Sequence, residues 1–324
     1  MVLSPLNAQI PIVHSPFMEE LFEKLNYTEE QKALCRQYSK IGYVIIDPEI
    51  PDVAGVEQRI HTSLAKEFKT KDRIINAWKF DKDVRALAVL PKVYEVLETL
   101  YGRKPIPFQT LNFEYGTEQP THSDTIHFNC KPEGFMCGVW IALEDIDEDN
   151  GPLHYYPGSH FTPRYDFSTL GIPASLNKDR MKNKGGVQVK NPLGPHLPEF
   201  LSEVIRAKGW QKELGLMRQG QAVIWAANTY HGGDPIRNRS RTRHSQVTHY
   251  YFEGCTYYTP YFSDPILGNT QYREITDIKT NQTVPNIYCG RSDIGKINTP
   301  IRRNVYKKLS VVKRLIGRIL SKSR

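Results

Sequence analysis

The sequence predicts a mainly β fold with flanking helices, in which many short strands form a jelly roll or a barrel. From about residue 108 to residue 252, short β-rich runs alternate with Gly, Pro, Asn and Asp. Patterns typical of amphipathic helices come before this block rather than between its strands. The chain has 324 residues, 39% of them hydrophobic and 11% aromatic, which is enough to fill the core of such a fold.

Helical patterns and one strand pattern occupy the first third of the chain. Thr28 followed by Gln31 is a capping-box pattern and predicts the start of a helix. The run "GYVIID" at 42–47 predicts a buried strand. Two further helical stripes follow, one on Val56, Ile60, Leu64 and Phe68, and one on Val93, Val96, Leu97 and Leu100 between Pro91 and Gly102. We expect residues 1–105 to form a helical buttress with an edge strand.

Residues 106–265 carry the strand-like runs and are expected to form the catalytic jelly-roll core. The clearest runs are "FQTLNFEYG", "FMCGVWIAL", "GPLHYYPGSH", "GQAVIWAAN" and "HSQVTHYYF". Between two of them lies the stretch 161–218, which is polar and rich in Gly, Pro and Lys. This stretch predicts an insertion, either a lid over a site or a plain surface loop.

The positive charge of the chain is concentrated in one segment. The net charge is +8, and residues 302–324 contain nine basic and no acidic residues, so the remainder is close to neutral. Apolar residues in this tail recur at helical spacing, at Val305, Leu309, Val312, Ile316 and Ile319. The extension 266–324 is therefore expected to end in a basic amphipathic helix. Peripheral contact with an anionic membrane and docking on the body fit the pattern equally, while nucleic acid is not expected because stacking aromatics are nearly absent.

The cysteines and the N-terminus favour a cytoplasmic protein. The five cysteines form no C-x-x-C pair, so neither a disulfide framework nor a zinc ribbon is indicated. The first twenty residues lack a basic and apolar signal pattern, and no apolar run approaches the ~18 residues needed to cross a bilayer. The tail then leaves peripheral attachment to a membrane surface as an open alternative.

Two separate segments suggest a metal site. In "THSDTIHFNC", His122 and Asp124 form an H-x-D pair, which on a strand would place both side chains on one face. One imidazole and one carboxylate at this spacing can bind a divalent iron and leave room for a second imidazole. His231, which ends the apolar run "AVIWAANTYH", can supply it. The tripeptide alone also fits an ordinary polar strand.

A basic residue beyond the second histidine suggests a binding site for an acidic cosubstrate. Arg243 lies 12 residues after His231 and directly precedes a strand-like run. A buried guanidinium can bind the far carboxylate of a keto-diacid with two hydrogen bonds. Ser245 would share its strand face and could donate another. The nearby Arg237, Arg239 and Arg241 fit a solvated basic loop, which is the competing interpretation for Arg243 as well.

Taken together, these segments resemble the phytanoyl-CoA dioxygenase family of iron(II)/2-oxoglutarate oxygenases. The resemblance runs from roughly residue 30 to residue 262 and includes "VWIALEDIDEDNGPLHYYPGSH", "IWAANTYHGG" and "RTRHSQV". It implies a double-stranded β-helix (jelly-roll, cupin-like) core and the cofactors Fe(II), 2-oxoglutarate and O2. It also implies roles for five residues: iron ligands at His122, Asp124 and His231, a 2-oxoglutarate anchor at Arg243, and a cosubstrate-lining aromatic at Trp140.

The sequence departs from the family pattern at two positions. Gly233 stands where phytanoyl-CoA dioxygenase has a serine that helps to hold 2-oxoglutarate, and Ser123 stands where glutamine is common. Ser245 or Thr110 could replace the contact of that serine. Asp124 is retained, whereas related halogenases have a small residue in its place, and this favours hydroxylation or a similar oxidation.

The resemblance implies a dioxygenase that hydroxylates a small or lipid-linked metabolite and releases succinate and CO2. Desaturation or epimerisation at the same metal site is one alternative. A non-catalytic jelly-roll binding module, recruited to membranes by its basic tail, is another. His127 and Asn150 are weaker candidates for substrate contacts, since a structural histidine and a turn are the simpler explanations for them. No segment indicates binding of the nucleotide part of coenzyme A.

Overall fold

The computed structural model describes residues 10–165, 170, 180–183, 186–189, 197–263, 270–288 and 290–292. The predicted basic helix at 302–324 and much of the predicted insertion at 161–218 lie outside the described residues. Within the described part of the chain, no helix is both long and apolar enough to cross a membrane.

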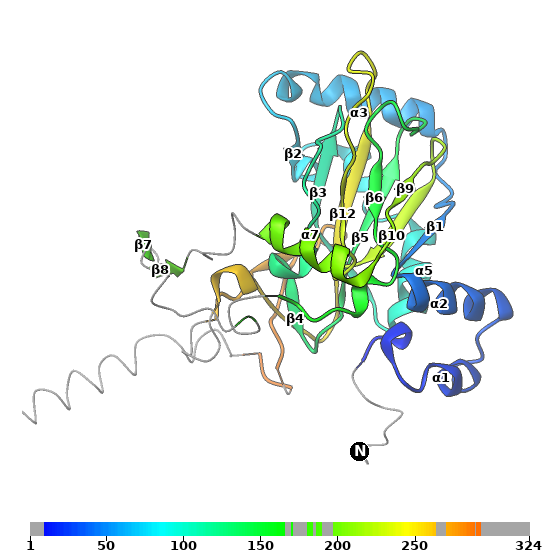
Figure 1. The fold of residues 1–324 in the computed structure, drawn as a ribbon, viewed down its shortest axis with the longest axis vertical. Coiled ribbons are helices and arrows are strands. Elements are labelled where there is room, and N and C mark those ends of the chain that lie inside the picture. The colour runs from blue at the N-terminus through cyan, green and yellow to red at the C-terminus, as the bar shows by residue number, and fades with distance from the viewer. Residues whose placement is uncertain are drawn as a thin grey trace, which may run out of the picture.

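Two antiparallel sheets form a jelly roll, which confirms the predicted fold class (Figure 1). The larger sheet has six strands in the order β1 (Tyr43–Ile46), β10 (Ala222–Ala226), β5 (Met136–Ala142), β12 (Ser245–Phe252), β3 (Pro105–Phe113) and β2 (Ile74–Ile75). The smaller sheet has three, in the order β11 (His231–Gly233), β6 (Leu153–Tyr155) and β9 (Glu213–Gly215). The segment before residue 105 thus supplies both edges of the larger sheet, where the sequence indicated a single edge strand.

Short elements complete the described structure. Three two-stranded ladders pair β13 (Thr256–Tyr258) with β4 (Asn129–Lys131), β14 (Ile275–Thr276) with β15 (Thr283–Val284), and β7 (Arg180–Asn183) with β8 (Gly186–Val189). Single 3₁₀ turns lie at Ile12–His14, Ala77–Lys79, Asp124–Ile126, Ser159–Phe161 and Pro260–Phe262. The turn at Asp124–Ile126 bears directly on the site.

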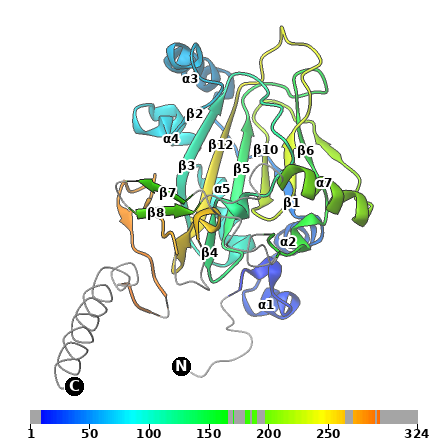
Figure 2. The ribbon, with the colours of Figure 1, turned by 60° about the vertical axis from the view of Figure 1, so that its left-hand side comes forward.

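The three helices predicted before the strand block are present as α2 (Glu29–Ile41), α3 (Val53–Phe68) and α5 (Pro91–Tyr101). The structure adds two short helices there that were not predicted, α1 (Met18–Lys24) and α4 (Lys82–Leu87), and a later helix, α7 (Leu197–Lys208), falls within 161–218. Thr28 and Gln31 form the predicted capping box. Figures 1 and 2 show α3 lying across the end of the larger sheet at which β3 ends and β12 begins, while α1 and α2 lie near the opposite end.

The larger sheet separates two hydrophobic clusters, because successive strand residues point to opposite faces. On β10, Ile224 faces the helices and packs in a cluster with residues of α2, α3, α4 and α5. Its neighbours Val223 and Trp225 face the smaller sheet and pack with Trp140 and Tyr155. Both faces are therefore buried, which explains why the central strands read as continuous apolar runs rather than as alternating ones.

A cavity of about 290 Å³ lies between the two sheets. Strands of both sheets line it: Gln109, Leu111 and Phe113 of β3, Trp140 of β5, Trp225 of β10, Val247 and His249 of β12, Leu153 of β6, and His231, Gly232 and Gly233 of β11. The predicted site residues His122, Asp124 and Arg243 line the same cavity.

A buried pair of side-chain amides joins β3 and β12, which form much of the cavity wall. The pair lies on the face of the larger sheet that points away from the cavity. Gln246 on β12 accepts a hydrogen bond from Asn112 Nδ2 on β3 at 3.1 Å. Its own amide donates to the carbonyl of Val84, in α4, at 3.0 Å. Both side chains are almost fully buried, so loss of one partner leaves a polar group unsatisfied away from water.

We predict that Gln246→Leu lowers the free energy of unfolding by about 2 kcal/mol, because Asn112 then loses its partner. Asn112→Leu should cost a similar amount, and the double variant should lose clearly less than the sum of the two single losses. Urea denaturation of the three variants measures this coupling. Strictly additive losses would show that the pair does not act as a unit.

Candidate functional site

The first two predicted ligands are placed by a backbone bridge rather than by a strand. His122 and His231 exchange backbone hydrogen bonds at 2.9 and 3.0 Å, forming an isolated antiparallel bridge. Asp124 begins the 3₁₀ turn that follows, so the expectation of one strand carrying both residues is wrong. Ser123 between them has an extended backbone, with φ −125° and ψ 137°. One extended residue is enough to send the side chains on either side of it in the same direction.

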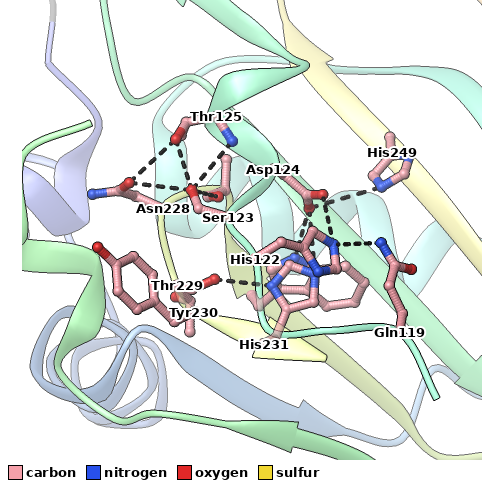
Figure 3. Close-up of polar contacts among 12 residues, drawn as sticks. Gln119, His122, Ser123, Asp124, Thr125, Asn228, Thr229, Tyr230, His231 and His249 are labelled. Carbon is pink, nitrogen blue, oxygen red and sulfur yellow. Dashed lines mark hydrogen bonds and ion pairs between the residues drawn. The ribbon is translucent and has the colours of Figure 1, made fainter. Parts of the chain in front are cut away.

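The three predicted metal ligands converge on one point (Figure 3). The Nε2 atom of His122 lies 3.9 Å from Oδ1 of Asp124, and Nε2 of His231 lies 3.8 Å from Oδ2. The two imidazole rings are 4.4 Å apart, and all three ligand atoms lie within 4.8 Å of one another. Two imidazoles and one carboxylate on one side of a point form the donor set of a facial triad, which leaves further coordination positions open.

Backbone carbonyls orient both imidazoles. Nδ1 of His122 lies 3.0 Å from the carbonyl of Pro120, and Nδ1 of His231 lies 2.9 Å from that of Thr229. A carbonyl only accepts, so each Nδ1 carries the proton and each Nε2 keeps its lone pair for a metal.

Trp225 orients the carboxylate in a comparable way. Its indole Nε1 donates to Oδ2 of Asp124 at 2.9 Å. The indole fits only because residue 138 on the neighbouring strand has no side chain: a Cβ on Gly138 would lie 2.1 Å from the Trp225 ring. Gly138 thus supports the metal ligand through Trp225.

Burial sets the protonation states required for metal binding. It lowers the pKa of His122 to about 4, aided by the nearby His231, and it also lowers the pKa of His231. Both imidazoles are therefore neutral near pH 7. For Asp124, burial acts to raise the pKa, but His231, His249, His122 and the indole of Trp225 together bring it below its usual value. The site therefore offers two neutral imidazoles and one carboxylate.

Two polar residues at the centre were missed by the sequence reasoning. His249 is buried on β12, and its Nε2 lies 3.8 Å from Oδ2 of Asp124, while its Nδ1 lies 3.1 Å from Oε1 of Gln109 (Figure 3). Gln119 places its Nε2 3.2 Å from Nε2 of His122, the atom that a metal would use. The alternation of Arg243, Val247 and His249 along one strand was a signal that could have revealed His249.

Arg243 is a buried cation without a carboxylate partner. Its side chain is 1% exposed, and its Nη1 donates to the carbonyl of Gly151 at 2.8 Å, while Nε has no hydrogen-bond partner. Among the described residues, no carboxylate forms an ion pair with it. Burial lowers its pKa to about 10, so the guanidinium stays charged at neutral pH. A buried charge of this kind calls for an anionic ligand.

Aromatic rings frame this cation. The guanidinium carbon lies 5.4 Å from the centre of the Trp140 ring and 5.7 Å from that of Phe113. Trp140 is fully buried, and its Nε1 has no partner. The predicted cosubstrate residues Trp140 and Arg243 thus come together on the wall that β5 and β12 share.

Of the other predicted site residues, one lines the cavity and three do not. Ser245 is buried beside Arg243 and donates to its carbonyl at 3.3 Å, but it does not line the cavity. Thr110 lies on the other face of β3 from the lining residues Gln109 and Leu111, so it does not reach the cavity. Asn150 bonds Asp145, Asp147 and Thr242 and serves the loop structure. His127 does line the cavity, with its ring 5.6 Å from that of Tyr261.

The glycine at position 233 has a local explanation. A Cβ there would lie 3.1 Å from the backbone nitrogens of Gln119 and Glu118. At Gly232 it would lie 2.7 Å from the carbonyl of Gln119. The chain passing at 118–119 therefore leaves little room for a serine at position 233.

The family model described as phytanoyl-CoA dioxygenase matches residues 47–245, which include all three converging ligands and Arg243. The chain belongs to the phytanoyl-CoA dioxygenase family. Its members are non-haem enzymes that depend on iron and 2-oxoglutarate and use O2. The predicted family is thereby confirmed.

Curated relatives carry the same family name. Mouse phytanoyl-CoA dioxygenase domain-containing protein 1 is 32% identical over 84 residues, or 25% of this chain and 29% of the relative. A probable phytanoyl-CoA dioxygenase of Caenorhabditis elegans is 25% identical over 42% of this chain and 56% of the relative. Rat peroxisomal phytanoyl-CoA dioxygenase is 22% identical over 71% of this chain and 62% of the relative. The chain thus matches between about a quarter and three fifths of the length of these relatives.

Solved structures share the fold. The 2-oxoglutarate-dependent carbocyclase of nogalamycin biosynthesis has a TM-score of 0.53 and 18% identity, covering 72% of this chain and 87% of that structure. EctD from S. alaskensis has a TM-score of 0.50 and 16% identity, covering 69% of this chain and 77% of that structure. At these low identities, the similarity shows that this member of the phytanoyl-CoA dioxygenase family shares its fold with the two solved proteins.

We predict that Trp225→Phe lowers the affinity for a divalent metal about tenfold, because Asp124 loses the donor that orients it. Isothermal titration of the metal-free protein with Co²⁺ measures the affinity. Trp140→Phe is the matched control, since its indole lines the same cavity but its Nε1 bonds nothing. Equal affinities for both variants would contradict a role of Trp225 in orienting the ligand.

Proposed function

We propose that this protein is an iron(II)/2-oxoglutarate-dependent dioxygenase that oxidises a C–H bond of a small-molecule substrate. One observation carries the proposal: a converging His-Asp-His set and a buried arginine without a carboxylate partner line the same cavity. The first fits a metal, and the second fits a dicarboxylate that would also reach that metal.

The metal would be held by His122, Asp124 and His231. The Nε2 atoms of the two histidines and the carboxylate of Asp124 face one another. The carbonyls of Pro120 and Thr229 fix the Nδ1 atoms of the histidines, and the indole of Trp225 fixes the carboxylate. Such outer contacts hold the ligands in place before the metal arrives. Gln119 would have to release Nε2 of His122, so we assign it a place beside the bound metal rather than in the ligand set.

The far carboxylate of 2-oxoglutarate would be bound by Arg243. The guanidinium is already desolvated and held by the Gly151 carbonyl, so binding requires little ordering of the side chain. Trp140 would line this end of the cosubstrate and offer its unpaired Nε1. Ser245 acts on the backbone of Arg243 instead of contacting the ligand. Iron(II) and 2-oxoglutarate, when bound, supply the activation of O2 with release of succinate and CO2.

The rest of the cavity would receive the substrate. Its walls are apolar at Leu111, Leu153 and Val247, while His249 and His127 add polar atoms. The lining supports a small molecule with apolar parts. A lipid-linked substrate and a contact of residues 302–324 with membranes stay predictions.

Hydroxylation is the outcome that the retained Asp124 favours. Solved proteins of the same fold are described as a carbocyclase and an epimerase, so this scaffold also supports other reactions. Product mass, measured after a screen for succinate release, separates these outcomes. A non-catalytic binding module has no use for three buried metal-binding groups held together at His122, Asp124 and His231, because burying them without a metal costs free energy.

The proposed activity predicts a visible absorption band when Fe(II) and 2-oxoglutarate are added to the protein without oxygen. His231→Ala should abolish the band because the metal loses one of its three ligands. With O2 and a substrate, wild type should release succinate and the variant should not. A wild-type protein that binds Fe(II) but forms no band with 2-oxoglutarate would refute the proposal.

The assignment of Arg243 predicts that Arg243→Gln weakens binding of 2-oxoglutarate by about 10- to 100-fold, the loss expected for one charged hydrogen-bonded pair. Iron affinity should not change. Anaerobic titration of the visible band with 2-oxoglutarate measures this. Arg241→Gln is the matched control, because Arg241 is bound to Asp147 at the surface two residues earlier. The proposed role of Arg243 fails if both variants bind 2-oxoglutarate as wild type does.

A further inference from the structure

A second group of metal-ligating side chains lies outside the cavity, where α3 meets the start of β12. Glu57 and His61 are four residues apart on α3 and therefore share one helix face. His244 directly precedes β12. One ligand atom from each of the three residues lies within 4.8 Å of the others, the same limit that the His122-Asp124-His231 set meets. None of them lines the cavity between the sheets.

The two imidazoles of this group are spaced like those of the first set. The rings of His61 and His244 are 4.5 Å apart, compared with 4.4 Å for His122 and His231. The carboxylate of Glu57 contacts Nδ1 of His244. All three side chains are half-buried or more, since their exposed fractions lie between 12% and 38%.

Further carboxylates surround the group. Two further carboxylates adjoin it: Glu114 Oε1 lies 3.8 Å from Nδ1 of His61, and Glu144 Oε2 lies 4.0 Å from Nδ1 of His244. Among the described residues, no lysine or arginine forms an ion pair with these two carboxylates or with Glu57. Three carboxylates thus surround two imidazoles, and such an arrangement favours a bound cation.

Several donor atoms in the group are buried and unpaired. Nδ1 of His61, Nε2 of His244 and Oε1 of Glu144 have no hydrogen-bond partner. Buried polar atoms of this kind cost free energy unless a ligand or a metal satisfies them. Two of these atoms belong to the imidazoles of the group, and the contact between Glu57 and Nδ1 of His244 satisfies neither of them.

We propose that Glu57, His61 and His244 bind a second divalent transition metal of the zinc type. Two imidazole nitrogens and one carboxylate oxygen are ligands that suit Zn²⁺, and a water would complete its four positions. The group lies outside the cavity between the sheets, so we assign the metal a structural role. It would fasten α3 to the residue that follows Arg243 and would leave the cavity free.

The competing explanation is that Glu57 and His244 form an ordinary ion pair that docks the helix. This predicts no metal binding once the cavity ligands are removed. The two explanations therefore differ in the number of zinc ions that the folded chain holds.

The test is to count zinc ions on the untagged full chain by native mass spectrometry after dialysis against Zn²⁺. Wild type should hold two, and the His122→Ala/His231→Ala variant should hold one. Adding His61→Ala and His244→Ala to that variant should reduce the count to none. Adding Gln58→Ala and Thr62→Ala, two exposed positions on the same helix, should leave it at one.

Two results would overturn the proposal: no zinc on the His122→Ala/His231→Ala variant, or one zinc that persists after His61 and His244 are replaced. Circular dichroism checks that the variants are folded. If the variant lacking both His61 and His244 does not fold, Glu57→Gln replaces it on the His122→Ala/His231→Ala background. Zn²⁺ should raise the thermal midpoint of that background but not that of its Glu57→Gln derivative, and equal shifts would count against the site.

Discussion

The backbone bridge between His122 and His231 is the constraint on which the site depends. Each residue donates its N–H to the carbonyl of the other, so two ligands from distant parts of the chain are fixed face to face. The same two segments meet again where the N–H of Asp124 and the hydroxyl of Ser123 both bond the carbonyl of Ala227. The metal set is thus a product of backbone pairing at the edge of the smaller sheet.

Burial then gives these residues their chemistry. The same desolvation that keeps the imidazoles neutral also lowers the pKa of Arg243, which still stays charged at neutral pH and has no carboxylate partner among the described residues. It also strengthens the hydrogen bond from Trp225 to Asp124. The sheet accommodates this at a specific place, because only the missing side chain of Gly138 lets the indole of Trp225 reach the carboxylate. The packing of Trp225 over Gly138 and the hydrogen bond to Asp124 therefore depend on each other.

The sequence predicted what depends on neighbours along the chain. The Thr28 cap, the α3 and α5 stripes and the central strands all have local signals, and the structure has them. His122, Asp124, His231 and Arg243 were named from motif order, and they line one cavity. His249 and Gln119 were missed because their approach to the centre depends on pairing between distant strands. Thr110 was predicted to contact the cosubstrate, but it lies on the opposite face of β3 from the cavity.

Strand β12 shows why one segment can serve several purposes. Alternate residues face opposite sides, so Val247 and His249 line the cavity in line with Arg243, while Gln246 bonds β3 and α4 on the outer face. His244 lies on the outer face, where it contacts Glu57 of α3. A displacement of the start of this strand would move Arg243 and His244 together. The outer contacts of β12 therefore help to set the position of the cation inside the cavity, which links the helices of the first hundred residues to the chemistry of the core.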